Sequence, residues 1–457
     1  MKISATILIA ITMLTAFNVS ANNNTIHKAC IDEPIFNGSA CVYQTNKAAK
    51  KTIILIHGLN GSALRDWRYQ IPVLSNDYHV LTFDLPGFGD SDKEVAYYSP
   101  REYAKFINYI ANRYAHGKAI VVGHSMGGAI SLRYSEMFPQ NIEKLILVDV
   151  AGVLHRMAYS RQLMKGWLKT RVSDDSRMLY HADRIANKVL NKVEPIVGPL
   201  SSFMSQYVLK SEVLDIDSST TSAVTLAHED LTDALSLLQI PTMIIWGEND
   251  TIAPIRTAQV LKSYLPEASL KVIKNAAHVP MVDQPQKFNK LIKSYLKKSG
   301  SVDYKTTNTQ AIKNKEDGAG RSATCEDDVD AIYEGYYENL DIINCNQVVI
   351  RNANIENLVI RSSSVSIENS EIISTETALD VGQSDVVITA SKLIGETAIK
   401  LSGSRLDLAG VTLIGEDFSV NGDESSSSLV FSVSMIDSKY DTREIHEFVK
   451  VDRDNPL

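Results

Sequence analysis

The chain of 457 residues shows two kinds of hydrophobic pattern, one in its first two thirds and another near its C-terminus. In the first part, short β-branched runs alternate with stretches in which apolar side chains recur every three or four residues, as at 100–114. The runs predict buried strands and the stretches predict amphipathic helices. This alternation is typical of an α/β fold, in which helices cover both faces of a mostly parallel sheet. A buried central strand is expected at 52–56, further strands at 79–83, 119–122, 145–149, 242–246 and 270–273, and an edge strand at 41–44.

Near the C-terminus the chain repeats itself with a period of about 20 residues. The segments 357–377, 378–397 and 398–417 align, 337–356 is an earlier copy, and 418–438 is a later, irregular one. In each copy Val, Leu and Ile alternate with Ser, Thr, Asp and Asn, so a stack of copies can bury an apolar face that one copy cannot. The pattern resembles a right-handed parallel β-helix of about five coils. Leucine-rich repeats share the period, but their helical half is not visible here.

Three further segments have compositions of their own. Residues 153–231 carry apolar side chains at helical spacing and fall between two predicted strands. Residues 300–323 are polar without an apolar period and predict a linker, and 439–457 form a charged tail. We therefore expect an α/β domain at 22–299 with a helical insert, followed by an all-β repeat domain at 324–438.

The N-terminus has the pattern of a targeting segment. A basic start, Met1-Lys2, precedes an apolar stretch without charge from Ile3 to Phe17, and small residues follow at Val19-Ser20-Ala21. This order predicts a signal peptide at 1–21 and export to a periplasm or out of the cell. An uncleaved membrane anchor is the alternative, which the shortness of the apolar stretch disfavours. No later segment approaches the length needed to span a bilayer.

Four cysteines fit an oxidising destination. Two local disulfides, Cys30–Cys41 and Cys325–Cys345, are the simplest of the three possible connectivities. Four buried free thiols are the alternative if the chain is not exported. These cysteine spacings are not those of zinc sites, and no metal or organic cofactor is implied. The net charge of −8 argues against general affinity for nucleic acids, which a basic face would provide.

The best candidate for chemistry is the pentapeptide Gly-His-Ser-Met-Gly at 123–127, which follows the predicted strand 119–122 and precedes a helical pattern. A strand, a sharp turn and a helix around G-x-S-x-G make a nucleophile elbow centred on Ser125. Glycines are expected on both sides because the backbone is strained at the serine and a side chain there would collide with its neighbours. The turn exposes the serine oxygen at the positive end of a helix.

Further motifs follow in order along the chain: His57-Gly58 after one strand, the turn from Asp84 to Ser91 after the next, and Asp250 and His278 after two late strands. In this order they resemble the α/β-hydrolase superfamily, in its capped, esterase-like branch, over about residues 35–296. The resemblance implies that 153–231 is a cap over the site and that the His-Gly pair begins an oxyanion loop.

The same resemblance implies roles for five residues. Ser125 would be the nucleophile, His278 its general base and Asp250 the carboxylate that orients the imidazole, in the chain order Ser, Asp, His. The backbone amides of Leu59 and Met126 would form the oxyanion hole.

Other acidic and histidine residues compete for these roles. Glu248 lies two residues before Asp250, and Asp149 follows the preceding strand at a position that some superfamily members use for the acid. His57 is expected to brace its loop. Asp84 and Asp90 are expected to be turn and helix-capping residues.

These features predict an exported serine hydrolase that cleaves a small-molecule or lipid carboxylic ester. One alternative keeps the triad for carbon–carbon hydrolysis of a dienoic ketone, which export disfavours. Another is a binding protein that contacts a polysaccharide or cell surface through the β-helix, a hypothesis that rests on fold analogy.

Overall fold

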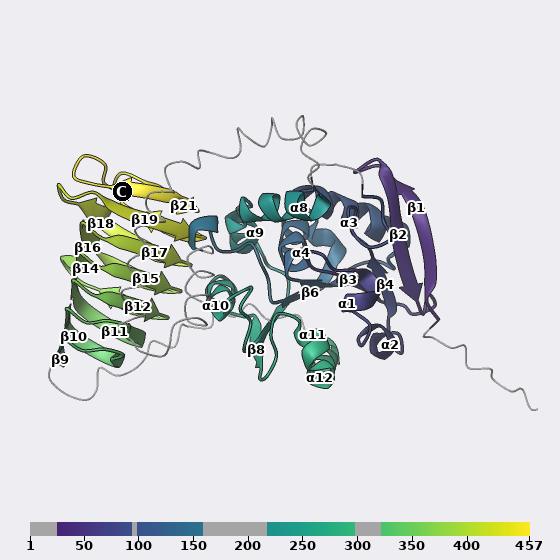
Figure 1. Cartoon of the computed structure of the whole chain (residues 1–457), viewed down its shortest axis with the longest axis horizontal. Coiled ribbons are helices and arrows are strands. Elements are labelled where there is room, and N and C mark those ends of the chain that lie inside the picture. The colour runs from purple at the N-terminus through teal and green to yellow at the C-terminus, as the bar shows by residue number, and fades with distance from the viewer. Residues whose placement is uncertain (1–24, 94–97, 159–216, 298–320) are drawn as a thin grey trace, which may run out of the picture.

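The computed structural model describes residues 25–93, 98–158, 217–297 and 321–457 (Figure 1). The predicted signal peptide, the middle of the predicted cap and nearly all of the predicted linker lie outside the described residues. Within the described part of the chain, no helix is long and apolar enough to cross a membrane.

An eight-stranded sheet forms the centre of the first part, in the order β1-β2-β4-β3-β5-β6-β7-β8. From β4 to β8 all neighbours pair in parallel, and β2 pairs with β4 antiparallel. The α/β fold and the strands expected at these positions are therefore confirmed, and β8, at the edge of the sheet, is only partly buried. The strands are β1 (His27–Glu33), β2 (Gly38–Thr45), β3 (Thr52–Ile56), β4 (His79–Phe83), β5 (Ala119–His124), β6 (Ile142–Val148), β7 (Thr242–Gly247) and β8 (Ser269–Ile273).

One expectation about this sheet is wrong. Residues 41–44 were expected at its edge, but they lie in β2, and β1 is the outer strand. β1 pairs antiparallel with β2 and places Cys30 opposite Cys41. Because most of β1 is exposed, its sequence lacks the apolar run that marks a buried strand.

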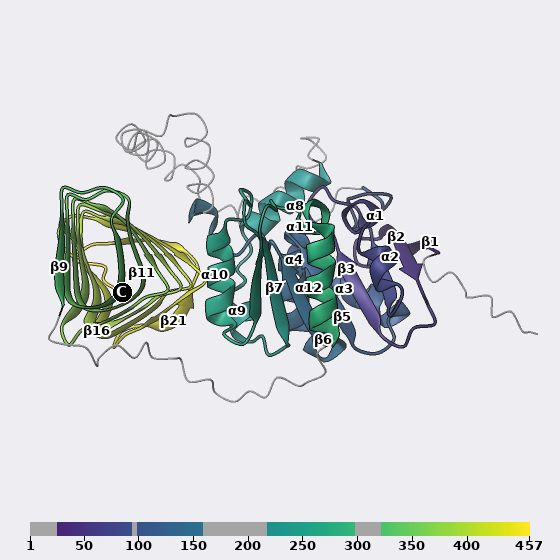
Figure 2. The same ribbon diagram turned by 90° about the horizontal axis from the view of Figure 1, so that it is seen from below.

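Helices cover both faces of this sheet (Figure 2). Successive side chains of β3 alternate between two cores: Ile54 and Ile56 pack with α3 and α4, whereas Ile53 and Leu55 pack with α12. The helix expected at 100–114 is α3, and the side chain of Ser99 caps it by accepting from the Glu102 amide. The helices are α1 (Ala63–Asp66), α2 (Ile71–Leu74), α3 (Pro100–Tyr114), α4 (Met126–Met137), α8 (Ser218–Ala227), α9 (Thr232–Ser236), α10 (Ile255–Tyr264), α11 (Pro280–Asp283) and α12 (Pro285–Lys297), with a 3-10 turn at Pro139–Asn141.

A buried histidine makes the stability of this part depend on pH. His79 is 1% exposed, and burial, with a smaller effect of His116, lowers its pKa from 6.5 to about 4. Between these pH values His79 binds a proton in the unfolded chain but not in the folded chain. Stability is therefore lost as the pH falls from about 6.5 towards about 4. We expect His79→Gln to lower the number of protons taken up on unfolding in this window by about one. Tm should therefore depend less steeply on pH. The exposed His27→Gln is the control, and equal slopes for both variants and the wild type would contradict the prediction.

The C-terminal part is all β, and its strands stack in one fourteen-stranded arrangement (Figure 1). Most neighbours pair in parallel; Ser364 pairs with Asp385, Asp385 with Arg405, and Arg405 with Ser428. Equivalent strands thus recur about every 20 residues, as the repeat predicts. The strands are β9 (Ser322–Glu326), β10 (Ile332–Ile343), β11 (Val348–Arg361), β12 (Ser364–Glu368), β13 (Glu371–Ile373), β14 (Thr377–Gly382), β15 (Asp385–Thr389), β16 (Lys392–Ser402), β17 (Arg405–Ala409), β18 (Thr412–Gly422), β19 (Ser427–Ser432), β20 (Ser434–Asp437), β21 (Thr442–Ile445) and β22 (Phe448–Val451).

A ladder of buried serines explains the polar residue at the turn of each repeat. The hydroxyl of Ser384 accepts from the amide of Ser363, that of Ser404 from the amide of Ser384, and that of Ser427 from the amide of Ser404. Each serine therefore satisfies a buried backbone donor in the preceding copy. The small hydroxyl side chain suits this position because it fits inside the stack and still accepts a hydrogen bond.

The ends of the repeat region differ from the expected boundaries. The last two residues of the predicted linker, Ser322 and Ala323, belong to β9, which pairs in parallel with β10. The charged tail contains β21 and β22, which pair antiparallel with β20 and β19. The helical winding of the repeat and its hand stay predictions.

The two parts contact each other along α10 (Figure 2). Arg256, in the first turn of α10, forms a buried ion pair with Asp407 of β17 at 2.9 Å. Its Nε also donates to the hydroxyl of Thr389 in β15. Val430 and Val433 of the C-terminal part join the same apolar core as α3 and α4. Charged and apolar contacts therefore both hold the repeat region against the α/β sheet.

Both expected disulfides are present, Cys30–Cys41 and Cys325–Cys345. Each closes a short loop within one part of the molecule.

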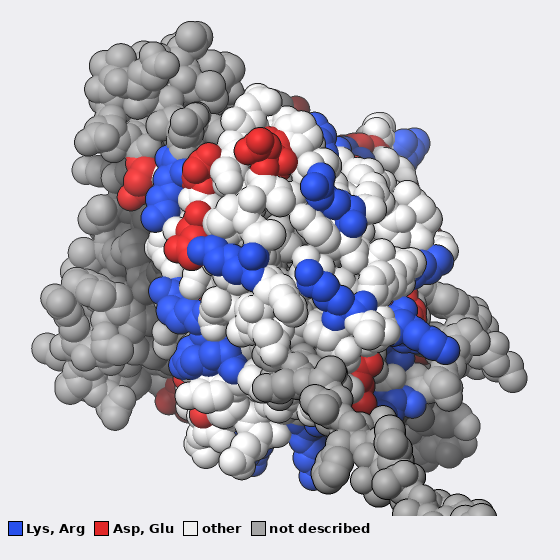
Figure 3. Space-filling view, turned by 90° about the vertical axis from the view of Figure 1, so that its right-hand side faces the viewer, with Lys and Arg blue, Asp and Glu red and all other residues white. Residues whose placement is uncertain are grey.

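Over the face seen in Figure 3, Lys and Arg lie among Asp and Glu, so this face presents no field of a single sign.

Candidate active site

The turn between β5 and α4 holds Ser125 in a strained conformation, with φ 53° and ψ −119°. A Cβ on Gly123 would lie 2.2 Å from the carbonyl oxygen of Gly127. A Cβ on Gly127 would lie 2.6 Å from the carbonyl oxygens of Ile56 and His57. The geometry thus explains why glycine is needed on both sides of the serine, as the sequence predicts.

Two loops bring a histidine and an aspartate to this serine. Ser125 Oγ lies 2.9 Å from Nε2 of His278, and Nδ1 of the same ring lies 2.8 Å from Oδ2 of Asp250. Asp250 follows β7 and His278 follows β8, so both come from the carboxyl ends of parallel strands, where open α/β sheets place their sites. The other oxygen of Asp250 accepts from the amides of Ile252 and Ala253, which fixes the carboxylate.

The two rival acids have other partners. Glu248 accepts from the amide of Asn275, and Oδ1 of Asp149 accepts from the amide of Gly247. The carboxylate of Asp250, by contrast, hydrogen-bonds His278 and is fully buried. Of the three acids, Asp250 is therefore the one whose carboxylate hydrogen-bonds the imidazole.

Two other histidines hold the site together. His57 is fully buried; its Nδ1 donates to the carbonyl of Gly58 and its Nε2 accepts from the amide of Leu85, so it braces the loop as expected. Burial lowers the pKa of His57, which keeps the ring neutral. His124, whose role the sequence did not reveal, donates from Nε2 to the carbonyl oxygen of His278 at 2.6 Å. Burial, with the neighbouring His278, lowers the pKa of His124 to about 4.

The loop that starts at His57 lies directly against the serine. A Cβ on Gly58 would lie 3.0 Å from the Cβ of Ser125, so glycine permits this close approach. Within the described residues, the amides of Leu59 and Met126 donate to no other group. Met126 is the first residue of α4, whose positive end favours a negative charge. Both residues are thus chain neighbours of the close contact between Gly58 and Ser125, and their amides are free among the described residues.

A family model described as the α/β hydrolase fold matches residues 51–285, just over half of the chain. The chain belongs to the α/β-hydrolase fold family. The match contains the serine, the aspartate and the histidine described above.

Named relatives of this α/β hydrolase include lipases. Lipase 1 of Psychrobacter immobilis is 27% identical over 254 residues, covering 54% of this chain and 77% of the relative. Lipase 3 of Moraxella sp. strain TA144 is 26% identical over 254 residues, covering 54% and 78%. Among solved structures, an esterase of Exiguobacterium antarcticum is 22% identical, with a TM-score of 0.44, covering 60% of this chain and all of the esterase.

In this hydrolase Asp84 and Asp90 are structural, as expected. Asp84 Oδ1 accepts from the amide of Ala63, the first residue of α1, and Oδ2 accepts from Tyr43 Oη and the amide of Asp90. The exposed side chain of Asp90 pairs with Lys28 at 2.6 Å. Neither carboxylate contacts the serine or the histidine of the site.

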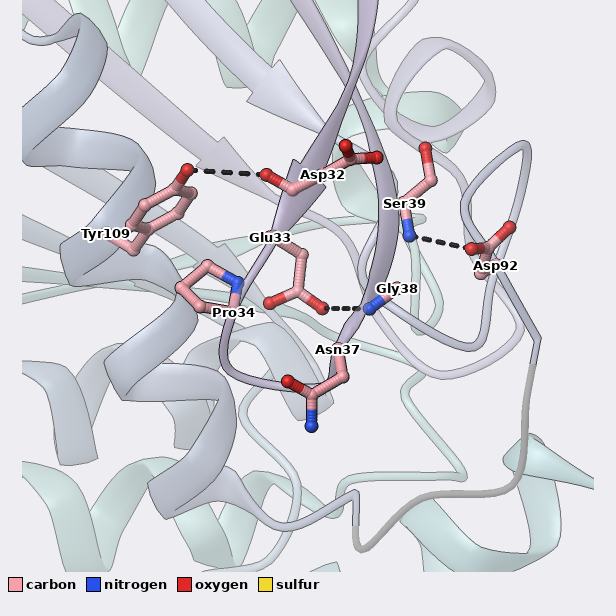
Figure 4. A pocket seen from close by; sticks show the side chains of 8 residues that line it. All are labelled: Asp32, Glu33, Pro34, Asn37, Gly38, Ser39, Asp92 and Tyr109. Carbon is pink, nitrogen blue, oxygen red and sulfur yellow. Dashed lines mark hydrogen bonds between the residues drawn. The ribbon is translucent and has the colours of Figure 1, made fainter.

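A hollow on the surface of the hydrolase lies apart from this site, at the turn between β1 and β2 (Figure 4). Three acids line it, and two of them serve the local fold: Glu33 accepts from the amide of Gly38, and Asp92 from that of Ser39. The hollow shares no residue with the Ser125 site. Its lining is Asp32, Glu33, Pro34, Asn37, Gly38, Ser39, Asp92 and Tyr109. Across the described ranges, no three His, Cys, Asp or Glu side chains converge as a metal site would require.

Proposed function

We propose that this α/β hydrolase is an exported serine hydrolase that cleaves carboxylic esters through an acyl-enzyme on Ser125. The observation that carries the proposal is the continuous hydrogen-bonded chain from Ser125 through His278 to Asp250. A serine hydroxyl is a poor nucleophile until an imidazole accepts its proton, and this chain supplies both the imidazole and the carboxylate that orients it.

The proposed reaction has two acyl-transfer steps. Ser125 Oγ attacks the acyl carbon while His278 Nε2 takes the hydroxyl proton, and the amides of Leu59 and Met126 hold the oxyanion that forms. The tetrahedral intermediate collapses, and the alcohol leaves with the proton from His278. Water then attacks the acyl-enzyme with His278 again as base, which releases the carboxylic acid and restores Ser125.

The substrate class rests on the relatives. Two of the similar proteins are named lipases, and a lipase cleaves a carboxylic ester. We therefore propose an ester of a small molecule or a lipid as the substrate. Residues 153–231 are proposed to be the cap that shapes the acyl pocket.

Export is the other half of the proposal. The disulfides Cys30–Cys41 and Cys325–Cys345 suit an oxidising compartment, which the sequence pattern of residues 1–21 also indicates. We further propose that residues 324–438 form one parallel β-helix, supported by the parallel pairing of successive repeats. The comparisons do not support the polysaccharide contact suggested by the repeat, and it forms no part of the proposal.

Hydrolysis of p-nitrophenyl esters from acetate to palmitate by the full chain tests the function. We expect turnover with a single optimum in chain length, because kcat/KM is highest for the acyl chain that fills a pocket of fixed size. A short optimum would identify an esterase and a long one a lipase. The absence of hydrolysis at every length, together with no labelling by a fluorophosphonate probe, would contradict the proposal, and a dienoic ketone would then be assayed directly.

A further inference from the structure

Asp149 is a buried acid next to the site that the proposed reaction does not use. It follows β6 directly, is fully buried, and has φ 42°, a left-handed conformation that is rare outside glycine. Its amide donates to the carbonyl of Ile245, and its Oδ1 accepts from the amide of Gly247. Two hydrogen bonds to β7 therefore fix its position and hold the buried carboxyl group in one place.

The second oxygen of this carboxyl group is unusual. Oδ2 of Asp149 is buried and accepts no hydrogen bond from any donor in the described part of the chain. A buried charged oxygen without a donor raises the free energy of the folded protein, so the protonated carboxyl group is the state of lower free energy. Burial raises the pKa of Asp149 well above its usual value of 3.8, and the carboxylates of Asp250 and Asp283 raise it further. The amide of Gly247 opposes this shift and does not reverse it.

Asp250 has room for one more donor. Its Oδ1 accepts two amides and its Oδ2 accepts from His278, whereas an ionised carboxylate offers about four acceptor positions. Gly247 joins the two acids: its amide donates to Oδ1 of Asp149, and its carbonyl accepts from the amide of Asp250. A side-chain hydrogen bond with Asp250 is also among the causes that raise the pKa of Asp149. A proton on Asp149 therefore has an acceptor beside it, and two adjacent carboxyl groups that share one proton avoid the repulsion of two charges.

We propose that Asp149 holds a proton and donates it in a hydrogen bond to the carboxylate of Asp250, which makes Asp149 a positioning residue for the acid of the triad. This inference rests on the proposed function, because it assigns Asp250 the task of orienting His278. Asp149 fixes the carboxylate without adding a second negative charge beside the imidazole. The acid groups whose negative charges raise its pKa are Asp250, in the turn after β7, and Asp283 of α11.

The Asp149→Asn variant tests whether Asp149 is a neutral donor or an ionised carboxylate. Asparagine keeps the acceptor for the amide of Gly247, presents an NH₂ donor to Asp250 and tolerates a positive φ. We expect this variant to keep kcat, KM and the midpoint of the acid limb of the kcat/KM profile. If Asp149 were ionised in the wild type, the substitution would remove a negative charge, and the limb would move to lower pH by about one unit. That shift would overturn the proposal.

Asp149→Ala removes the donor altogether. We expect kcat per titrated active site to fall about 10- to 100-fold, with KM unchanged because Asp149 does not line the surface that faces substrate. Counting active sites with a fluorophosphonate corrects for misfolded protein, so a purely structural role would lower Tm and the number of active sites but leave kcat per site unchanged. An unchanged kcat per site, or an equal loss in Asp149→Asn, would overturn the proposal.

A measurement without substrate keeps this inference separate from the proposed function. Because the folded-state pKa of Asp149 is raised, its contribution to stability is fully present below about pH 3.8 and is lost as the pH rises towards the folded-state value. Asp149→Asn has no such group, so its Tm relative to the wild type should increase steadily from pH 4 to 8. A difference in Tm that stays constant over this range would overturn the proposal even if the chain hydrolyses esters. A rising difference would support a protonated Asp149 even if it does not.

Discussion

Replacing Ser125 with alanine is expected to lower kcat for ester hydrolysis by about 10⁴-fold or more. The serine oxygen lies 2.9 Å from Nε2 of His278, so its removal deletes the nucleophile and leaves the imidazole without a proton to accept. The fold should survive, because the elbow depends on the glycines around the serine, and alanine needs no more space. Single-turnover and steady-state rates on the best p-nitrophenyl ester, with Tm measured in parallel, provide the test.

Ser135→Ala is the matched control. Ser135 lies in α4, the helix that follows Ser125, and is also buried. Its hydroxyl donates to the carbonyl of Ser131, one turn earlier, and to no other group among the described residues. We expect this variant to keep its activity and its labelling by a fluorophosphonate. Retention of most activity in a pure Ser125→Ala preparation would remove the serine from the mechanism.

The sequence was sufficient to predict the α/β sheet and to name the residues that meet at the site. Each of Ser125, Asp250 and His278 follows a β-branched run, and parallel strands end at one edge of a sheet, so strand prediction alone brings the three loops to the same edge. The glycines at 123 and 127 were predictable for the same local reason. Short-range patterns carry this kind of information well because they depend only on neighbouring residues.

Contacts between distant segments carried no such signal. His124 occupies the variable position of G-x-S-x-G, and nothing in its neighbours indicates that it donates to the backbone of His278, 154 positions away. The sequence offers Asp149 as a rival acid, but the left-handed backbone of Asp149 and the lack of a donor to its Oδ2 among the described residues are evident only in three dimensions. The exposed strand β1 lacked an apolar run, so no periodicity could reveal it.

The contact between the two parts is the clearest example. Arg256 and Asp407 are 151 positions apart, one in a helix of the α/β part and the other on a strand of the repeat, where alternation alone would predict a surface residue. Their burial depends on how the repeat lies against α10. Periodicity predicts which side of a strand a residue occupies, but it does not predict whether another part of the chain covers that side.

This buried ion pair leads to the largest expected effect on stability. Arg256→Met leaves the carboxylate of Asp407 at 7% exposure without its two guanidinium bonds of 2.9 Å. An isolated charge in such a place costs about 3–5 kcal/mol, so the contact between the parts should weaken by that amount. Urea unfolding of the full chain should show the loss as an earlier first transition.

The double variant Arg256→Met with Asp407→Leu distinguishes two causes of the loss in stability. One is the lost attraction between the two side chains, and the other is the unpaired buried charge that Asp407 keeps in the single variant. Because well-packed apolar residues often replace a buried pair at little cost, the double variant should regain most of the stability that the single variant loses. Lys51→Met is the control: Lys51 pairs with Glu143 at 2.6 Å on the surface, and breaking an exposed pair costs about 0–1 kcal/mol. A loss in Arg256→Met no larger than in Lys51→Met would mean that solvent reaches Asp407, and that the apolar contacts of Val430 and Val433 hold the repeat in place without help from the ion pair.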